Sequence, residues 1–130
     1  MNPMPDACAD RLEVLLAELR RFVRERDWEQ FHDPKNLAMA IASEAGELLA
    51  EYRWVENRAS DLYSEADDHR NRIAAEIGDV GIALLLLCDR VGLDLVEAMR
   101  AKLAANAVKY PVDKSRGKPE APGGGTKATL

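Results

Sequence analysis

The sequence contains few aromatic residues, cysteines and histidines. Of its 130 residues, 5% are Phe, Trp or Tyr, and there are two cysteines and two histidines. Such a scarcity of thiolate and imidazole ligands argues against a zinc site. Cys8 lies near the N-terminus and Cys88 lies in an apolar run, so we expect no disulfide and a reducing, cytoplasmic location.

Basic charge and long apolar runs are also missing. The net charge is −5 and the isoelectric point is about 5.1, so we expect no nucleic-acid polymer as a partner. The longest apolar run, residues 80–88, is far shorter than the roughly 20 residues of a membrane span, so we expect no membrane association. Residues 1–11 show no basic segment followed by an apolar one, so we expect no signal peptide.

Apolar residues recur at helical spacing along almost the whole chain, and no stretch alternates with a period of two. This pattern predicts an all-α protein, a bundle of about four helices in one domain over residues 1–111. The predicted helices cover residues 8–27, 34–56, 66–91 and 95–109. Residues 57–65 form a polar connection, and residues 112–130, which are rich in Lys, Pro, Gly and Ser, form a flexible tail.

Particular residues mark the ends of these helices. Asp33 can cap the second helix, with Pro34 in its first turn. Gly92 follows the third helix, and Asp94 is placed to cap the fourth. Pro111 then stops the fourth helix.

Two neighbouring helices each carry an acidic pair spaced three residues apart. At 100° per residue, Glu44 points the same way as the apolar stripe of the second helix, and Glu47 lies to one side. Glu76 lies at the edge of the stripe on the third helix, with Asp79 one turn further round. The stripe on the third helix consists of Ile73, Ile77, Val80, Leu84, Leu87 and Val91. We therefore expect all four carboxylates to lean toward a shared interior.

Inward-facing carboxylates repel one another, so they are either solvated at the rim of the bundle or gathered around a cation. Oxygen ligands suit Mg²⁺ or Mn²⁺. A di-iron bundle is the alternative metal chemistry, but it uses Glu-x-x-His pairs, and neither acidic pair contains histidine. Gly46 and Gly78 each precede the second acid of a pair. Glycine within a helix costs about 0.5–1 kcal/mol, which suggests close approach of another helix or a ligand.

Other residues could bind a ligand or serve the fold. Trp54 follows Glu47 by seven residues, about 10.5 Å along one helix face, and either contacts a ligand or is a core or interface anchor. Trp28 and His32 lie in the turn before the same helix, where His32 either orients the loop or contacts a ligand.

Three segments together resemble the MazG-like all-α nucleoside triphosphate pyrophosphohydrolases, most closely the dCTP pyrophosphatase branch. They are "RDWEQFHDPKNLAMAIASEAGELLAEYRW", "EIGDVGIALLL" and "KLAANAVKYPVDKSRGK", and the resemblance covers about residues 12–118. The spacing of E-x-x-E and E-x-x-D is moderately specific alone, and the flanking segments in this order make it highly specific.

The resemblance implies Mg²⁺-dependent cleavage of a nucleoside triphosphate to a monophosphate and pyrophosphate, as nucleotide-pool house-cleaning. It implies that Glu44, Glu47, Glu76 and Asp79 are metal ligands and catalytic residues. It also implies that six residues contact the nucleotide: Trp28, His32, Trp54, Lys102, Asn106 and Tyr110. For Lys102, Asn106 and Tyr110 the alternative is a solvated helix face. Family members commonly form dimers of dimers, so we expect a homotetramer.

Two departures from the dCTP branch concern the nucleoside pocket. Ala83 stands where the branch has a tyrosine, and Leu19 stands in place of a histidine. dCTP or a modified dCTP is the favoured substrate, but a dUTP hydrolase or a broad-range (d)NTP hydrolase stays open. A non-catalytic helical interaction module is the alternative of a different class. Lys114, Arg116 and Lys118 could form a lid over the triphosphate.

Overall fold

The chain is helical throughout the part that its computed structural model describes, residues 7–119, with side chains described from residue 11 onward. No strand occurs within this range, which confirms the all-α prediction. None of the helices described there is long and apolar enough to cross a membrane. The end of the predicted tail, residues 120–130, and the side chain of Cys8 lie outside the described part.

Four long helices match the four that the sequence predicts, and two short helices are added. The helices are α1 (Ala7–Glu25), α2 (Pro34–Tyr52), α3 (Ser60–Glu65), α4 (Asp67–Val91), α5 (Leu95–Lys109) and α6 (Val112–Ser115). Two 3₁₀ turns, Glu29–Phe31 and Asn57–Ala59, lie before α2 and α3. The short α3 occupies much of the predicted polar connection, and α6 lies in the predicted tail.

The expected caps are present. The Asp33 carboxylate accepts a hydrogen bond from the backbone N–H of Asn36 at 3.0 Å, with Pro34 in the first turn of α2. The Asp94 carboxylate accepts one from the backbone N–H of Glu97 at 2.9 Å and begins α5 in the same way. Gly92 ends α4 at a φ of 70°, a left-handed conformation that favours glycine.

The second helix is shorter than predicted, and this changes the position of Trp54. α2 ends at Tyr52 rather than near residue 56, and a backbone hydrogen bond from the N–H of Val55 to the carbonyl of Tyr52 turns the chain. Trp54 therefore does not share a helix face with Glu47. Its side chain is 87% exposed, and the Arg53 guanidinium lies 5.4 Å from the centre of its ring.

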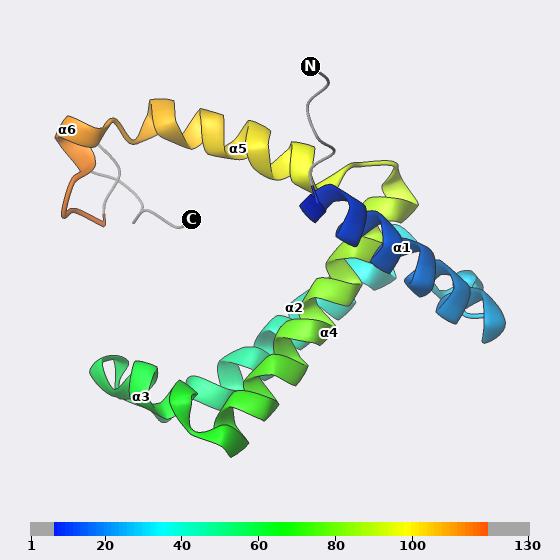
Figure 1. Ribbon diagram of the computed structural model, residues 1–130, viewed down its shortest axis with the longest axis horizontal. Coiled ribbons are helices and arrows are strands. Elements are labelled where there is room, and N and C mark those ends of the chain that lie inside the picture. Colours follow the sequence, from blue (N-terminus) through cyan, green and yellow to red (C-terminus); the bar gives the residue numbers. More distant parts are fainter. Residues whose placement is uncertain (1–6, 120–130) are drawn as a thin grey trace. The chain divides into compact units, whose positions relative to one another are not determined.

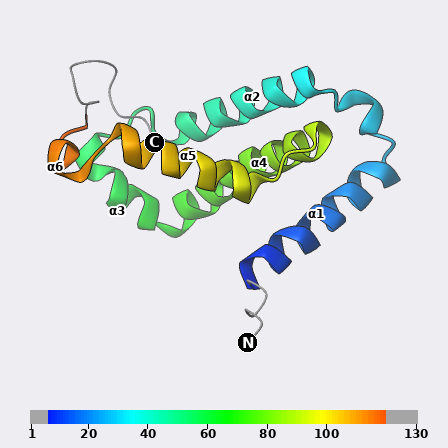
Figure 2. The same cartoon turned by 90° about the horizontal axis from the view of Figure 1, so that it is seen from above.

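The contacts divide the chain into two compact units, and the boundary between them in the sequence lies between Gly92 and Leu93. In the first unit, α2 and α4 run side by side over most of their length, with α1 and α3 against α4 (Figures 1 and 2). Its buried apolar residues are Leu19, Val23, Leu37, Ile73, Ala83 and Leu85. The second unit contains α5 and α6. The single domain over residues 1–111 stays a prediction.

Several large apolar side chains of the first unit face outward. Two residues of the apolar stripe predicted on α4, Ile77 and Val91, are 55% and 45% exposed, so the stripe is only partly covered within the described part of the chain. Phe22 and Ile82 are also exposed. The first unit therefore presents apolar surface that its own helices leave uncovered.

Candidate metal centre and adjoining cavity

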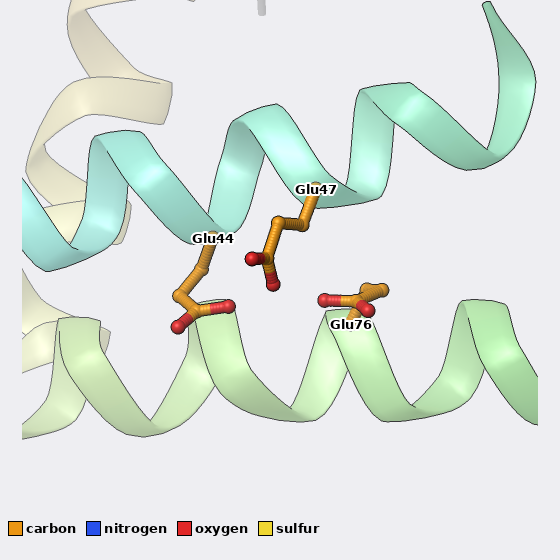
Figure 3. A group of neighbouring side chains, drawn as sticks. All are labelled: Glu44, Glu47 and Glu76. Atoms are coloured by element: carbon orange, nitrogen blue, oxygen red, sulfur yellow. The ribbon is translucent and has the colours of Figure 1, made fainter.

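Three carboxylates meet between α2 and α4. Glu44 and Glu47 extend from α2 toward α4, and Glu76 extends from α4 toward α2 (Figure 3). One carboxylate oxygen from each residue lies within 4.8 Å of the other two. The inward lean that helical spacing predicts for these three residues is thus present in the structure.

Two of these carboxylates are partly shielded from solvent and incompletely paired. Oε2 of Glu44 and Oε2 of Glu76 are both buried and have no hydrogen-bond partner in the described part of the chain. A buried polar atom without a partner is unfavourable by about 1–3 kcal/mol on the scale of protein mutations. Glu47 is exposed. The cluster therefore has oxygen atoms available for a ligand that can replace water.

The carboxylates also make one another harder to ionise. A shared hydrogen bond with Glu47 raises the pKa of Glu44 above its ordinary value, and partial burial and the charges of Glu47, Asp79 and Glu76 add to the effect. Burial is the main cause that raises the pKa of Glu76, followed by the charge of Glu47. Clustered like charges of this kind are favourable only when a cation or a proton compensates them.

The donor set fits a hard divalent cation. Carboxylate oxygens are the ligands that Mg²⁺ and Mn²⁺ prefer, and the cluster contains neither thiolate nor imidazole. The two orphaned oxygens of Glu44 and Glu76 are the atoms such an ion would satisfy. Glu44, Glu47 and Glu76 are therefore the residues that could hold it.

Asp79, the fourth predicted ligand, lies beside this group rather than within it. Its side chain is exposed, and it is not one of the three residues whose oxygens converge. It is near enough for its charge to raise the pKa of both Glu44 and Glu76. Asp79 and Glu44 also line the same cavity. Its role as a ligand stays a prediction.

The two helix glycines next to the acids have open space around them. A Cβ atom added at Gly46 or at Gly78 would meet nothing within 4 Å. Close approach of another helix, which the sequence suggested, is therefore absent for the described part of the chain.

Glu44, Glu47, Glu76 and Asp79 form an acidic row along the facing sides of α2 and α4. This row ends in an ion pair that the sequence did not predict. Glu51, one turn after Glu47 on α2, accepts a hydrogen bond from Nε of Arg72 at 3.2 Å. Arg72 lies one turn before Glu76 on α4. In the sequence, Glu51 follows Glu47 by four residues and Arg72 precedes Glu76 by four. This spacing indicates a pair only when the register between the two helices is known.

At the opposite end of the row lies a largely apolar cavity of about 270 Å³. It is lined by residues of α1, α2, α4 and the turn before α2, namely Leu19, Phe22, Val23, Trp28, His32, Leu37, Ala40, Glu44, Asp79, Ile82, Ala83 and Leu86. Its carboxylates, Glu44 and Asp79, belong to the acidic row. The cavity is therefore continuous with the candidate metal centre.

The turn after α1 places Trp28 at this cavity. Asp27 adopts a positive φ of 54°, and the Gln30 side chain donates to its carbonyl oxygen at 2.9 Å. The backbone N–H of Trp28 donates to the carbonyl of Val23 at 3.0 Å. The Trp28 ring then meets Phe22 edge to face, with ring centres 5.8 Å apart. Trp28 is 44% exposed, so part of the ring remains open to a ligand.

His32 lines both this cavity and a smaller, more polar one of about 120 Å³. The smaller cavity contains Arg20 and Asp89, which form an ion pair between α1 and α4. His32 is half-buried and follows the 3₁₀ turn. Its position is consistent with either of the roles that the sequence left open.

The other four residues that are predicted to contact the nucleotide do not line this site within the first unit. Trp54 lines neither of the two cavities described above. Lys102, Asn106 and Tyr110 belong to the second unit, where Lys102 is exposed and the other two are half-buried. Nucleotide contacts from these four residues stay predictions.

The fold and the site define an all-α protein with a cation-fitting carboxylate centre between two antiparallel helices. Residues 39–121 match the MazG-like family, and the chain belongs to that family, as the sequence resemblance predicts. It is 38% identical over 109 residues to mouse (Mus musculus) dCTP pyrophosphatase 1, covering 81% of this chain and 64% of that protein. It is 35% identical over 108 residues to the human (Homo sapiens) dCTP pyrophosphatase 1, covering 80% and 64%.

Thus the chain spans about 64% of the length of these curated relatives. A crystal structure of a pyrophosphatase from Archaeoglobus fulgidus is similar over nearly its whole length. The two structures align with a TM-score of 0.72 at 33% sequence identity, covering 85% of this chain and 98% of the archaeal one.

Proposed function

We propose that this chain is a nucleoside triphosphate pyrophosphohydrolase that requires a divalent cation, Mg²⁺ or alternatively Mn²⁺. The observation that carries the proposal is the convergence of Glu44, Glu47 and Glu76 with two orphaned buried oxygens. Membership of the MazG-like family and similarity to proteins named dCTP pyrophosphatase 1 support it. The structural similarity to an archaeal pyrophosphatase supports it further.

The proposed reaction adds water across the bond between the α and β phosphates. The water oxygen joins one phosphorus atom, the bridging oxygen leaves with the other, and the products are a nucleoside monophosphate and pyrophosphate with release of a proton. When bound, Mg²⁺ neutralises phosphate charge and makes water more acidic. Glu44, Glu47, Glu76 and Asp79 would hold the ion, and one of these carboxylates would orient the water or accept its proton.

The adjoining cavity is suited to the nucleobase. Trp28 offers an aromatic face, and stacking of a base on such a ring contributes about 1–3 kcal/mol. His32 adds a polar group to the same wall. Leu19 and Ala83 make much of the rest apolar, and an apolar wall discriminates weakly between bases of similar shape. We therefore propose dCTP or a modified dCTP as the leading substrate, within a broader range of deoxynucleotides.

Residues outside this cavity complete the proposed nucleotide contacts. Trp54 would contact the nucleotide, while Lys102, Asn106 and Tyr110 would contact phosphate and sugar. The role proposed for the protein is house-cleaning of the nucleotide pool in the cytoplasm, which the free thiol of Cys88 fits. Cell fractionation checks that location, and recovery outside the cytoplasm would contradict it.

A homo-oligomer, specifically a tetramer, is part of the proposal. Phe22, Ile77 and Ile82 are 45%, 55% and 41% exposed, respectively, and large apolar side chains of this kind favour burial against a second subunit. Sedimentation velocity measures the state directly. A single species with the mass of one chain would contradict it.

The test is purified protein incubated with Mg²⁺ and each nucleoside triphosphate in turn, with pyrophosphate and orthophosphate measured separately. We expect pyrophosphate, with the highest kcat/KM for cytosine deoxynucleotides. A higher value for dUTP would favour the dUTP hydrolase, and similar values for all bases would favour a broad-range enzyme. Orthophosphate instead of pyrophosphate would move cleavage to the β–γ bond. No product from any nucleotide would leave the non-catalytic helical module as the explanation.

A further inference from the structure

The facing sides of α2 and α4 change in chemistry from one end to the other. Leu37 and Ala40 of α2 line the apolar cavity together with Ala83 and Leu86 of α4. The carboxylates follow, and the Glu51–Arg72 pair closes the row. From Glu44 to Glu51 the rise along α2 is about 10.5 Å. The site thus has an apolar end, an acidic middle and a cationic end.

The hydrogen bonds that hold Arg72 in place use only some of its N–H groups. Its Nε donates to Oε2 of Glu51, and hydrogen bonding first to Glu51 and then to Tyr63 raises the pKa of Arg72. A guanidinium carries five N–H donors in total, so further donors remain. The side chain of Glu51 is 19% exposed, whereas that of Arg72 is 52% exposed. Glu51 is therefore the more enclosed anchor, and the guanidinium remains accessible from solvent.

We propose that Arg72 binds the terminal phosphates of the nucleotide and fixes the direction in which the substrate lies. This inference rests on the proposed function. The base occupies the apolar cavity, the α phosphate lies near the carboxylates, and the β and γ phosphates extend toward Arg72. Arginine is well suited to this task because its planar fork forms two parallel hydrogen bonds with phosphate oxygens.

The reverse orientation is chemically unfavourable. It would place a triphosphate among Leu19, Ala83 and Leu86, where a buried charge lacks partners. In the proposed orientation the departing pyrophosphate, which carries the negative charge of the broken bond, leaves beside a cation. Glu51 is then a positioning residue, since it acts through Arg72.

The test uses the full-length protein with Mg²⁺ and measures binding by calorimetry with two probes, inorganic pyrophosphate and dCMP. In Arg72→Gln we expect pyrophosphate binding to weaken about 10- to 100-fold, the range for loss of a charged hydrogen-bonding group. We expect dCMP binding to change by less than about twofold, because dCMP lacks the terminal phosphates. Arg70→Gln, which makes the same charge change two residues away on α4, is the matched control and should bind both probes as the wild type does.

Arg72→Lys keeps the charge but lacks the planar fork, so we expect a smaller loss of pyrophosphate binding. This variant also serves if Arg72→Gln does not fold. Weaker dCMP binding with unchanged pyrophosphate binding would overturn the orientation. Unchanged binding of both probes, or wild-type protein that binds no pyrophosphate, would overturn the role of Arg72. Absence of turnover in the wild type would instead refute the proposed function, and the pyrophosphate titration would still decide the phosphate site.

Discussion

Helix α4 carries acids in two contrasting environments. Near its C-terminal end, Asp89 pairs with Arg20 of α1, whose guanidinium donates to both carboxylate oxygens through Nε and Nη2. This hydrogen bonding lowers the pKa of Asp89 below its ordinary value. Between three and four turns earlier on the same helix, Glu76 meets other carboxylates, and burial and their charge raise its pKa. On the same helix, the surroundings of Asp89 therefore favour the ionised carboxylate, and those of Glu76 oppose it.

The contrast separates a carboxylate that has its counter-ion within the chain from carboxylates that have none there. Asp89 already has its counter-ion within the chain, so the folded state gains from its charge. Glu44 and Glu76 have buried oxygens without a partner, so the folded chain gains nothing from their charges until a cation is supplied. Acids in a cleft whose pKa values are raised by burial and by neighbouring acids are candidates for functional sites, whereas acids paired with a base are typical of structural contacts.

The largest effect is expected from Glu76→Gln, which removes one charge from the unpaired group. We expect kcat/KM to fall about 100-fold or more, the scale for loss of one electrostatic contact to a transition state. In chelator the variant should be at least as stable as the wild type, because it removes repulsion with Glu47. Steady-state kinetics and urea unfolding measure the two quantities.

Glu65→Gln is the matched control for this variant, since Glu65 is an exposed acid at the end of α3. It should leave both kinetics and stability unchanged. Full activity in Glu76→Gln would remove Glu76 from the metal centre. Strong destabilisation of that variant in chelator would show that Glu76 belongs with Asp89 among the structural acids.

A second, smaller effect should follow addition or removal of the metal. A ligand that binds only the folded state stabilises it by about 2.7 kcal/mol at 100 times its Kd. We therefore expect Mg²⁺ to raise the Tm of the wild type, and chelator to reverse the change. In Glu76→Gln the shift should shrink. Equal shifts in wild type and variant would mean that Mg²⁺ binds elsewhere.

The sequence predicted those parts of the molecule that depend on local rules. Helix periodicity gave the four long helices, and Asp33 and Asp94 were correctly identified as N-caps because capping depends on neighbours within one turn. The sequence also predicted that the two acids of each pair point in similar directions, because residues three apart share a helix face. Convergence of Glu44, Glu47 and Glu76 followed once α2 and α4 were assumed to face each other.

Features that depend on register and on tertiary contacts were not predictable. Arg72 reaches Glu51 across 21 positions in sequence, so the pair is visible only when the two helices are aligned. α2 ends early at Tyr52, and the Tyr52 hydroxyl instead hydrogen-bonds to Ser64 of α3 at 2.7 Å. The His69 ring stacks on Tyr63 with ring centres 3.8 Å apart. Such packing has no one-dimensional signal.

The smallest effect is expected at the paired acid. Asp89→Asn should reduce the free energy of unfolding by no more than about 1 kcal/mol at neutral pH, because an ion pair this open to solvent is screened. The pKa of Asp89 is lower in the folded state, so its contribution is fully present above the unfolded pKa, near 3.8, and disappears as the pH falls through the folded value. Urea unfolding of wild type and variant between neutral and acidic pH measures the difference.

Glu25→Gln supplies the control, since Glu25 lies on the same helix as Arg20 and its ion pairs with Arg21 and Arg26 are both exposed. It should show little difference from the wild type at any pH. Convergence of the wild-type and Asp89→Asn stabilities at low pH would identify the charge of Asp89 as the stabilising element. A difference that persists below the folded pKa would instead assign the effect to packing and hydrogen bonding of the side chain. In that case the opposite pKa shifts along α4 would not mark a division between structural and functional acids.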